Sequence, residues 1–139
     1  MRVVLDTTVL VAAARSRRGA SNALLLRLPD PAFQSAISVP LFIEYEAVLL
    51  RSENLLNRDP ETVESFLNFL LSVSHLQEVF FAWRPALPDS DDDFILELAV
   101  AAGCRYIVTH NIRDFRGSEK WGIRAVTPSD FLKLIETQT

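Results

Sequence analysis

The segment Arg2-Val3-Val4-Leu5-Asp6-Thr7-Thr8 constrains the fold of this chain more than any other stretch. Its apolar residues follow one another without alternation, which is typical of a parallel strand buried on both faces of a sheet. The run then ends abruptly in a carboxylate and two hydroxyls. Ligands bind at the carboxyl ends of parallel strands in open α/β sheets, so the segment places Asp6 where chemistry is usually done.

Predicted strands and helices alternate along the rest of the chain. Ser21, Ser38 and Asp59 are each expected to cap a helix. The alternation predicts an α/β protein with three layers, α/β/α, around a central, mostly parallel sheet of four to five strands. No repeat or linker interrupts residues 1–139, so we expect a single domain. The later strands are predicted over residues 33–37, 76–82, 104–109 and 124–126.

The composition excludes several classes of protein. The single cysteine, Cys104, leaves no internal disulfide or cysteine-based zinc cluster, and 4 glycines leave no glycine-rich phosphate loop. A formal net charge of −4 argues against broad electrostatic binding to nucleic acid, although nearly all the cations are arginines, which suit bidentate phosphate contacts. No apolar run is long enough to cross a bilayer and no signal-peptide pattern is present, so we expect a cytoplasmic protein.

One acidic residue is out of place in an apolar helical segment. Glu44 shares a helix face with Leu41 and Val48, and an unpaired carboxylate is costly to bury there. Two interpretations remain open: a structural ion pair with an arginine such as Arg51, or a metal ligand.

Residues 89–93 form an acidic run just before another predicted helix. One or two acids suit a helix N-terminus, but a denser group repels itself unless a cation is present. Helical spacing places Asp92 on the inward face with Ile95 and Ala99, and Asp93 about 100° away. Asp92 is therefore expected to be the acid that turns towards the sheet.

Polar residues also follow the predicted strand over 104–109, where Asn111 and Asp114 lie in a loop. Carboxylates that converge without a serine–histidine or cysteine–histidine arrangement suit hard cations such as Mg²⁺ or Mn²⁺. Such a cluster can activate water for phosphoryl chemistry or hold a structural ion. A haloacid dehalogenase phosphatase would need a second Asp where Thr8 stands, and neither Lys120 nor Lys133 suits a response-regulator receiver.

Four segments in order carry a resemblance over nearly the whole chain: residues 4–13, the helix of Glu44, residues 89–99 and residues 108–115. The chain resembles a PIN-domain ribonuclease of the kind found as toxins in prokaryotic VapBC-type toxin–antitoxin pairs. The resemblance implies that Asp6, Glu44 and Asp92 match the three main acidic positions of the family. Asn111 stands at the fourth position, where many members carry Asp, and Asp114 follows it.

The resemblance further implies an endoribonuclease that uses Mg²⁺ or Mn²⁺ to hydrolyse RNA phosphodiester bonds. The implied metal ligands are Asp6, Glu44, Asp92, Asn111 and Asp114, of which the four acids are also the catalytic residues. Thr7 and Thr109 are expected to support them by hydrogen bonds to an acid or to water. A small antitoxin and a second copy of the chain are the implied protein partners. The arginines expected to contact RNA phosphates are Arg15, Arg17, Arg18, Arg113 and Arg116.

A second hypothesis comes from a different class of protein. The neutral Asn111 favours a catalytically weak or inactive PIN-like module that acts through RNA or protein partners, whereas the retained Asp6, Glu44 and Asp92 oppose it. Binding without metal-dependent turnover would distinguish this module from the enzyme.

Overall fold

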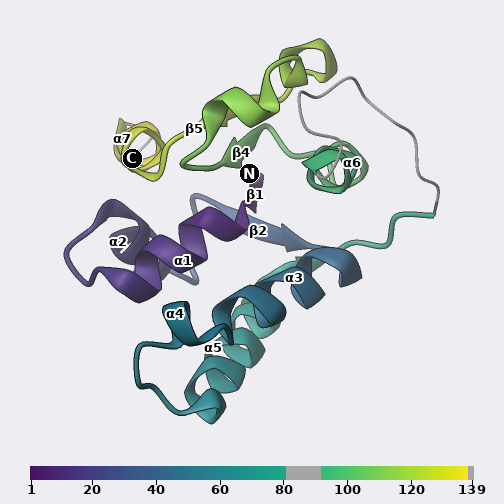
Figure 1. Ribbon diagram of the computed structural model, residues 1–139. Helices are drawn as coiled ribbons and strands as arrows, with labels where there is room; N and C mark the ends of the chain where they lie inside the picture. Colours follow the sequence, from purple (N-terminus) through teal and green to yellow (C-terminus); the bar gives the residue numbers. More distant parts are fainter. Residues whose placement is uncertain (81–91, 138–139) are drawn as a thin grey trace.

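The computed structural model describes residues 1–80 and 92–137 of the chain. Within these residues a 5-stranded, all-parallel sheet has the order β3-β2-β1-β4-β5 (Figure 1). This arrangement confirms the predicted α/β class. The strands are β1 (Arg2–Leu5), β2 (Gln34–Ile37), β3 (His75–Leu76), β4 (Tyr106–Val108) and β5 (Arg124–Val126).

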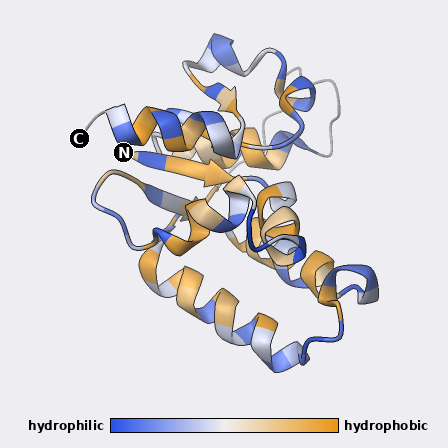
Figure 2. Cartoon of the chain, turned by 90° about the vertical axis from the view of Figure 1, so that its left-hand side faces the viewer, coloured by the Kyte–Doolittle hydropathy of each residue, from blue (hydrophilic) through white to orange (hydrophobic). Residues whose placement is uncertain are grey.

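Strand β1 lies at the centre of the sheet and is its most apolar part. Val3, Val4 and Leu5 are fully buried, and Figure 2 shows the strand as hydrophilic at its start, next to the N-terminus, and hydrophobic from there to its end. Helix α6 (Asp93–Ala101) covers one face through contacts with β1, β2 and β4, while α1 (Thr7–Arg15) and α2 (Ala20–Leu26) lie on the other side (Figure 1). Burial on both faces explains why the sequence of β1 does not alternate.

The remaining helices begin where local capping chemistry predicts them. The Ser38 side chain accepts a hydrogen bond from the backbone N–H of Leu41 at 3.3 Å, and Asp59 accepts one from Glu61 at 3.0 Å. Ser21 is different, because α2 already begins at Ala20, so the prediction that Ser21 caps this helix is wrong. The other helices are α3 (Val39–Leu49), α4 (Ser52–Leu55), α5 (Pro60–Val73), α7 (Pro128–Thr137) and the short 3₁₀ helices η2 (Ile112–Phe115) and η3 (Ser118–Trp121).

The third strand is much shorter than the predicted 76–82. β3 pairs with β2 alone, and its last pair joins Leu76 to Ile37. Strand β2 ends at Ile37 because Ser38 turns the chain into α3, so β3 has no further partner. Residues 77–80 continue without strand structure, and residues 81 and 82 lie outside the described part.

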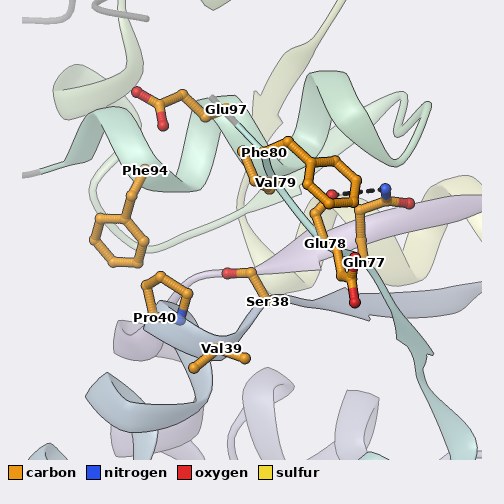
Figure 3. A pocket seen from close by; sticks show the side chains of 9 residues that line it. All are labelled: Ser38, Val39, Pro40, Gln77, Glu78, Val79, Phe80, Phe94 and Glu97. Carbon is orange, nitrogen blue, oxygen red and sulfur yellow. Dashed lines mark hydrogen bonds between the residues drawn. The ribbon is translucent and has the colours of Figure 1, made fainter. Parts of the chain in front are cut away.

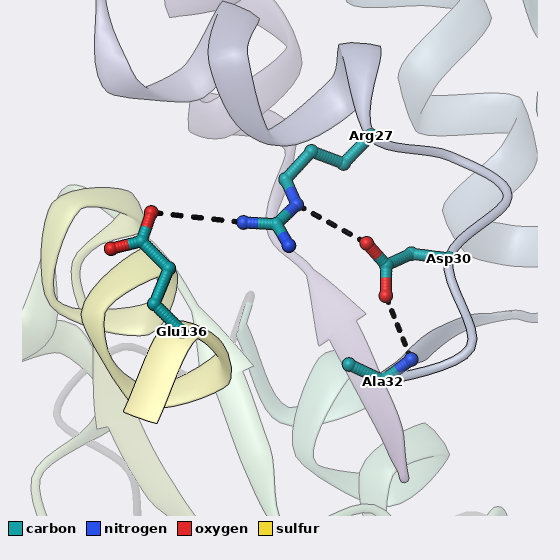
Figure 4. Close-up of polar contacts among 4 residues, drawn as sticks. All are labelled: Arg27, Asp30, Ala32 and Glu136. Atoms are coloured by element: carbon teal, nitrogen blue, oxygen red, sulfur yellow. Dashed lines mark hydrogen bonds and ion pairs between the residues drawn. The ribbon is translucent and has the colours of Figure 1, made fainter. Parts of the chain in front are cut away.

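Helix α7 packs against α2 beside the sheet, and its contacts there are mainly apolar. The rings of Phe33 and Phe131 meet edge to face with their centroids 5.2 Å apart. Figure 4 shows Arg27 between Asp30, at 3.1 Å, and Glu136 of α7, at 3.8 Å. The Glu136 side chain is 64% exposed, so its ion pair contributes little to stability compared with the aromatic contact. None of the helices in the described part of the chain is long and apolar enough to span a membrane.

Candidate active site

A pocket of about 470 Å³ opens where β1 and β4 end. Four carboxylates from separate parts of the chain line it: Asp6 directly after β1, Glu44 in α3, Asp92 immediately before α6, and Asp114 in η2. Asn111 also lines the pocket. The fold thus brings all five predicted ligands to one pocket, because parallel strands and the elements that follow them converge at one edge of the sheet.

Asp6 is buried and held from two sides. Its Oδ2 accepts hydrogen bonds from the hydroxyl of Thr8 at 2.7 Å and from that of Thr109 at 2.8 Å. Its backbone N–H donates to the carbonyl of Val108 at 2.9 Å, which extends the β1–β4 pairing by one residue. Asp6 is the N-cap of α1, yet its side chain makes no capping hydrogen bond. The carboxylate is therefore oriented by the two hydroxyls, one of them on α1, rather than by the free backbone N–H groups at the start of that helix.

The same two hydroxyls connect Asp6 to the loop after β4. The backbone N–H of His110 donates to Thr8 at 3.2 Å, and that of Asn111 donates to Thr109 at 2.9 Å. Thr109 and Thr8 thus both donate to the same acid, and Thr8 was not among the residues predicted to support one. Its position two residues after an aspartate is a local signal that could have identified it.

Glu44 is half-buried and is held by a different threonine. The hydroxyl of Thr7 donates to Glu44 Oε2. Thr7, the first residue of α1, therefore holds the acid of α3 and not Asp6. Its neighbour Thr8 reaches Asp6 instead, because successive helical residues point about 100° apart. Among the described residues no ion pair joins Glu44 to Arg51, so the structural ion pair is not formed.

Tyr45 follows Glu44 in α3, and its side chain reaches the end of the strand that precedes Asp6. It is fully buried, and its hydroxyl donates to the carbonyl of Leu5 at the end of β1. Burial raises the pKa of the Tyr45 hydroxyl well above its usual value, and the charges of Asp6 and Glu44 raise this pKa further.

The acidic run differs from its prediction. Asp92 lines the pocket but is only half-buried, whereas Asp93 is 3% exposed and its Oδ1 has no hydrogen-bond partner in the described part of the chain. Glu97, one turn further along α6, is also buried. The prediction that Asp92 alone turns inward is wrong, because Asp92 precedes the helix and helical spacing cannot be extended back to it. Asp89 and Asp91 lie outside the described residues.

The predicted phosphate-binding arginines lie in or just after two elements that line the pocket, α1 and η2. Arg15 lines the pocket itself, where its Nε and one terminal nitrogen donate to Asn54 Oδ1 at 3.1 and 2.7 Å. The others are exposed and lie outside the lining: Arg17 and Arg18 follow α1, and Arg113 and Arg116 lie in or next to η2.

The chemistry of the donor set fits a hard divalent cation. Carboxylate and amide oxygens are the protein ligands that Mg²⁺ and Mn²⁺ prefer, and the lining supplies four carboxylates and one amide. Within residues 1–80 and 92–137, however, no three His, Cys, Asp or Glu side chains are close enough to hold an ion together. The lining residues are therefore of the chemical type that such an ion prefers and share one pocket. In the described part of the chain they do not form a compact cluster.

A second pocket, of about 430 Å³, lies between the start of α3 and α6 (Figure 3). Figure 3 shows Phe94 and Pro40 on one side of it and Phe80 on the other, with Glu97 above. Its lining includes none of the predicted site residues and is mainly apolar. It therefore offers a weaker setting for phosphodiester chemistry than the pocket of Asp6.

Comparison with known proteins relates the chain to one family and to a known fold. A family model described as PIN domain matches residues 2–113, which is most of the chain. Among solved structures 14 chains match. One belongs to the crystal structure of VapBC2 from Rickettsia felis bound to a DNA fragment from their promoter; it is 18% identical, has a TM-score of 0.60, and the match covers 91% of this chain and 98% of that chain. This likeness is one of fold. No curated protein matches the chain.

Proposed function

The chain belongs to the PIN domain family, and from that premise we propose that it is a divalent-metal-dependent endoribonuclease, the toxin of a toxin–antitoxin pair. The observation that carries the proposal is the single pocket lined by Asp6, Glu44, Asp92 and Asp114. These carboxylates come from four separate parts of the chain, and the lining contains neither a serine nor a cysteine. Such a donor set suits metal-assisted hydrolysis.

The four acids and Asn111 would hold Mg²⁺ or Mn²⁺. A bound ion of this kind activates water and stabilises the charge that develops on a phosphodiester. Thr8 and Thr109 keep the Asp6 carboxylate in place, and Thr7 does the same for Glu44. Asn111 contributes an oxygen without charge, so Asp114 supplies the fourth negative charge of the pocket. The exposed arginines on α1 and η2 attract RNA phosphates towards this acidic site.

The test is cleavage of a mixed RNA pool in the presence of Mn²⁺ or Mg²⁺. Wild type is compared with Asp6→Asn and with wild type in EDTA. Loss of one carboxylate ligand should lower the cleavage rate by about 100-fold or more, since the metal provides several kcal/mol of transition-state stabilisation. Asp130→Asn is the matched control, because Asp130 is exposed on α7 and lies outside the pocket lining.

A second measurement separates binding from catalysis. Calorimetric titration with Mn²⁺ should give a weaker affinity for Asp6→Asn than for wild type and Asp130→Asn. Cleavage that survives EDTA would contradict the proposal. Metal binding and RNA binding without turnover would instead favour the PIN-like binding module, which the neutral Asn111 makes the second candidate.

The proposed antitoxin has a candidate docking surface on the helices, away from the acids. A groove of about 360 Å³ runs between α1, α2 and α5, and its lining is largely apolar. Leu26 in this lining is 77% exposed, and Phe69 is also exposed. Arg58 lines the groove, and the basic residues Arg17 and Arg18 follow α1. We propose that an amphipathic segment with acidic flanks, supplied by the antitoxin, occupies this groove.

A synthetic amphipathic helical peptide with glutamates on its polar face probes this surface. It should bind the wild-type protein in fluorescence anisotropy, and Leu26→Glu should abolish binding. A peptide with the same apolar pattern and lysines in place of the glutamates is the control. Equal binding of the two peptides, or unchanged binding to Leu26→Glu, would exclude the groove as the docking site.

A further inference from the structure

His110 and Ser21 form a polar contact at the rim of the acidic pocket. His110 lines the pocket, and its Nε2 lies 2.7 Å from Ser21 Oγ in α2. Ser21 is 2% exposed, whereas His110 is exposed. The backbone N–H of His110 is fixed as well, because it donates to Thr8 at 3.2 Å. The ring is therefore held at Nε2 and the backbone at its N–H, in spite of the exposure of His110.

The contact with Ser21 determines which ring nitrogen carries the proton. Buried hydroxyls almost always donate a hydrogen bond, and within the described residues the Ser21 hydroxyl bonds only to His110. We assign Ser21 as the donor to Nε2, because its hydroxyl then makes a hydrogen bond, and a neutral imidazole that accepts at Nε2 is protonated at Nδ1. Nδ1 makes no hydrogen bond within residues 1–80 and 92–137. The ring thus offers a fixed N–H donor to a ligand.

An RNA phosphate needs such a donor in this acidic pocket. Three lining residues carry side-chain N–H groups: Arg15, His110 and Asn111. Arg15 uses two of its nitrogens on Asn54, and Asn111 is assigned to the metal through its oxygen. The two lining threonines donate to carboxylates. Arg15 and Asn111 keep further N–H groups, and His110 adds to them a ring N–H beside the acids whose direction is set by the contact with the buried Ser21.

We propose that His110 is an RNA-binding residue whose Nδ1–H donates to a phosphate oxygen, and that Ser21 is the positioning residue that orients its ring. The inference rests on the proposed ribonuclease function and goes beyond it, because it names a residue and an atom that contact the substrate. The role depends on a hydrogen bond and on ring orientation, and it requires no change in the protonation state of His110.

Two amide variants of His110 separate the ring nitrogens. The side-chain N–H of His110→Asn lies near the position of Nδ1, whereas His110→Gln reaches Nε2 and Ser21 but leaves the Nδ1 position empty. Cleavage of RNA with Mn²⁺ is measured at one fixed pH. We expect KM to rise about ten-fold in His110→Gln, as for loss of a hydrogen bond to a charged group, with little change in kcat. His110→Asn should recover most of this loss, and Ser21→Ala should raise KM by a smaller factor.

His75→Gln is the matched control, since His75 is the other histidine and lies on β3 outside the pocket lining. Mn²⁺ affinity, measured by calorimetry, should be the same in all variants. An unchanged KM in His110→Gln, beside a wild type that cleaves RNA, would overturn this inference and leave the proposed function intact. Reduced Mn²⁺ affinity would also overturn it, because His110 would then serve the metal.

A wild type that cleaves no RNA would overturn the proposed function and this inference together. Circular dichroism establishes that each variant is folded. If His110→Gln does not fold, Ser21→Ala decides the question, because an unchanged KM in that variant means that ring orientation does not matter for RNA binding.

Discussion

Replacing Thr109 by valine should weaken the site and the fold together. Thr109 is fully buried, donates to Asp6 Oδ2 at 2.8 Å and accepts from the N–H of Asn111 at 2.9 Å. Valine has nearly the same shape, so the substitution removes the hydroxyl and leaves little cavity. A hydrogen bond to a charged group contributes about 1.5–3 kcal/mol. Asn111 is exposed, so water can replace its lost partner, and we expect the free energy of unfolding to fall by about 2–3 kcal/mol.

Urea unfolding followed by circular dichroism measures this loss. Thr109→Ser is the matched control, because it keeps the hydroxyl and removes one methyl group, for about 1 kcal/mol. Thr109→Val should therefore be less stable than Thr109→Ser, and it should bind Mn²⁺ more weakly. If valine is as stable as serine at this position, the hydroxyl does not hold Asp6 and the reasoning fails.

A double-mutant cycle assigns the effect to the charge of Asp6. A neutral amide accepts a weaker hydrogen bond than a carboxylate, by about 1 kcal/mol. In the Asp6→Asn background the loss caused by Thr109→Val should shrink by that amount. An identical loss in both backgrounds would mean that Thr109 stabilises the loop through Asn111 alone.

Three further predictions concern the core. Burial raises the pKa of Tyr45, and the charges of Asp6 and Glu44 raise it further. The contribution of the neutral Tyr45 hydroxyl to the free energy of unfolding is therefore complete below the pKa of an unfolded tyrosine, about 10, and is lost as the pH rises above it. Tyr45→Phe should therefore flatten the alkaline decline of the melting temperature, and an unchanged decline would contradict this. Burial raises the pKa of Cys104 to about 12 against the opposing effect of Arg2, so a thiol reagent should label it quickly only in denaturant, and rapid labelling of the native protein would refute the assignment. Leu67→Ala, at a buried position of α5, should cost about 2–5 kcal/mol in urea unfolding, and a loss as small as that of an exposed-site variant would show that α5 is not part of the core.

Features that depend on neighbouring residues could be predicted from the sequence. The helix starts at Ser38 and Asp59 are decided within three residues by a side chain that caps its own helix, and both predictions are confirmed. Strand β5 also has its predicted bounds, Arg124–Val126. Ser21 shows where local reasoning fails. Serine is a good N-cap by propensity, but its hydroxyl bonds to a histidine 89 positions away, and only the tertiary structure reveals that contact.

The sequence allowed us to predict which residues line the candidate site, but not which acids near it are buried. Strand ends converge in any parallel sheet, so Asp6 and the residues after β4 could be expected to share a pocket. The burial of Asp93 and Glu97 depends on where α6 begins within the acidic run, and no local signal decides that residue. The antitoxin, the homodimer, the cytoplasmic location and the extent of the single domain stay predictions.

The hydrogen bonds of the Asp6 side chain fit its proposed role as a metal ligand. An aspartate at a helix N-cap usually stabilises the helix by accepting a backbone N–H with its side chain, and Asp6 makes no such bond. The hydrogen bonds that the described residues give to its carboxylate all reach Oδ2, from hydroxyls on α1 and directly after β4. This arrangement fixes the carboxylate and keeps Oδ1 available for a ligand. Because the backbone of Asp6 also pairs with Val108, the central strands themselves set the distance between this acid and the loop of Asn111 and Asp114. The same pairing that stabilises the sheet thereby positions the two sides of the site.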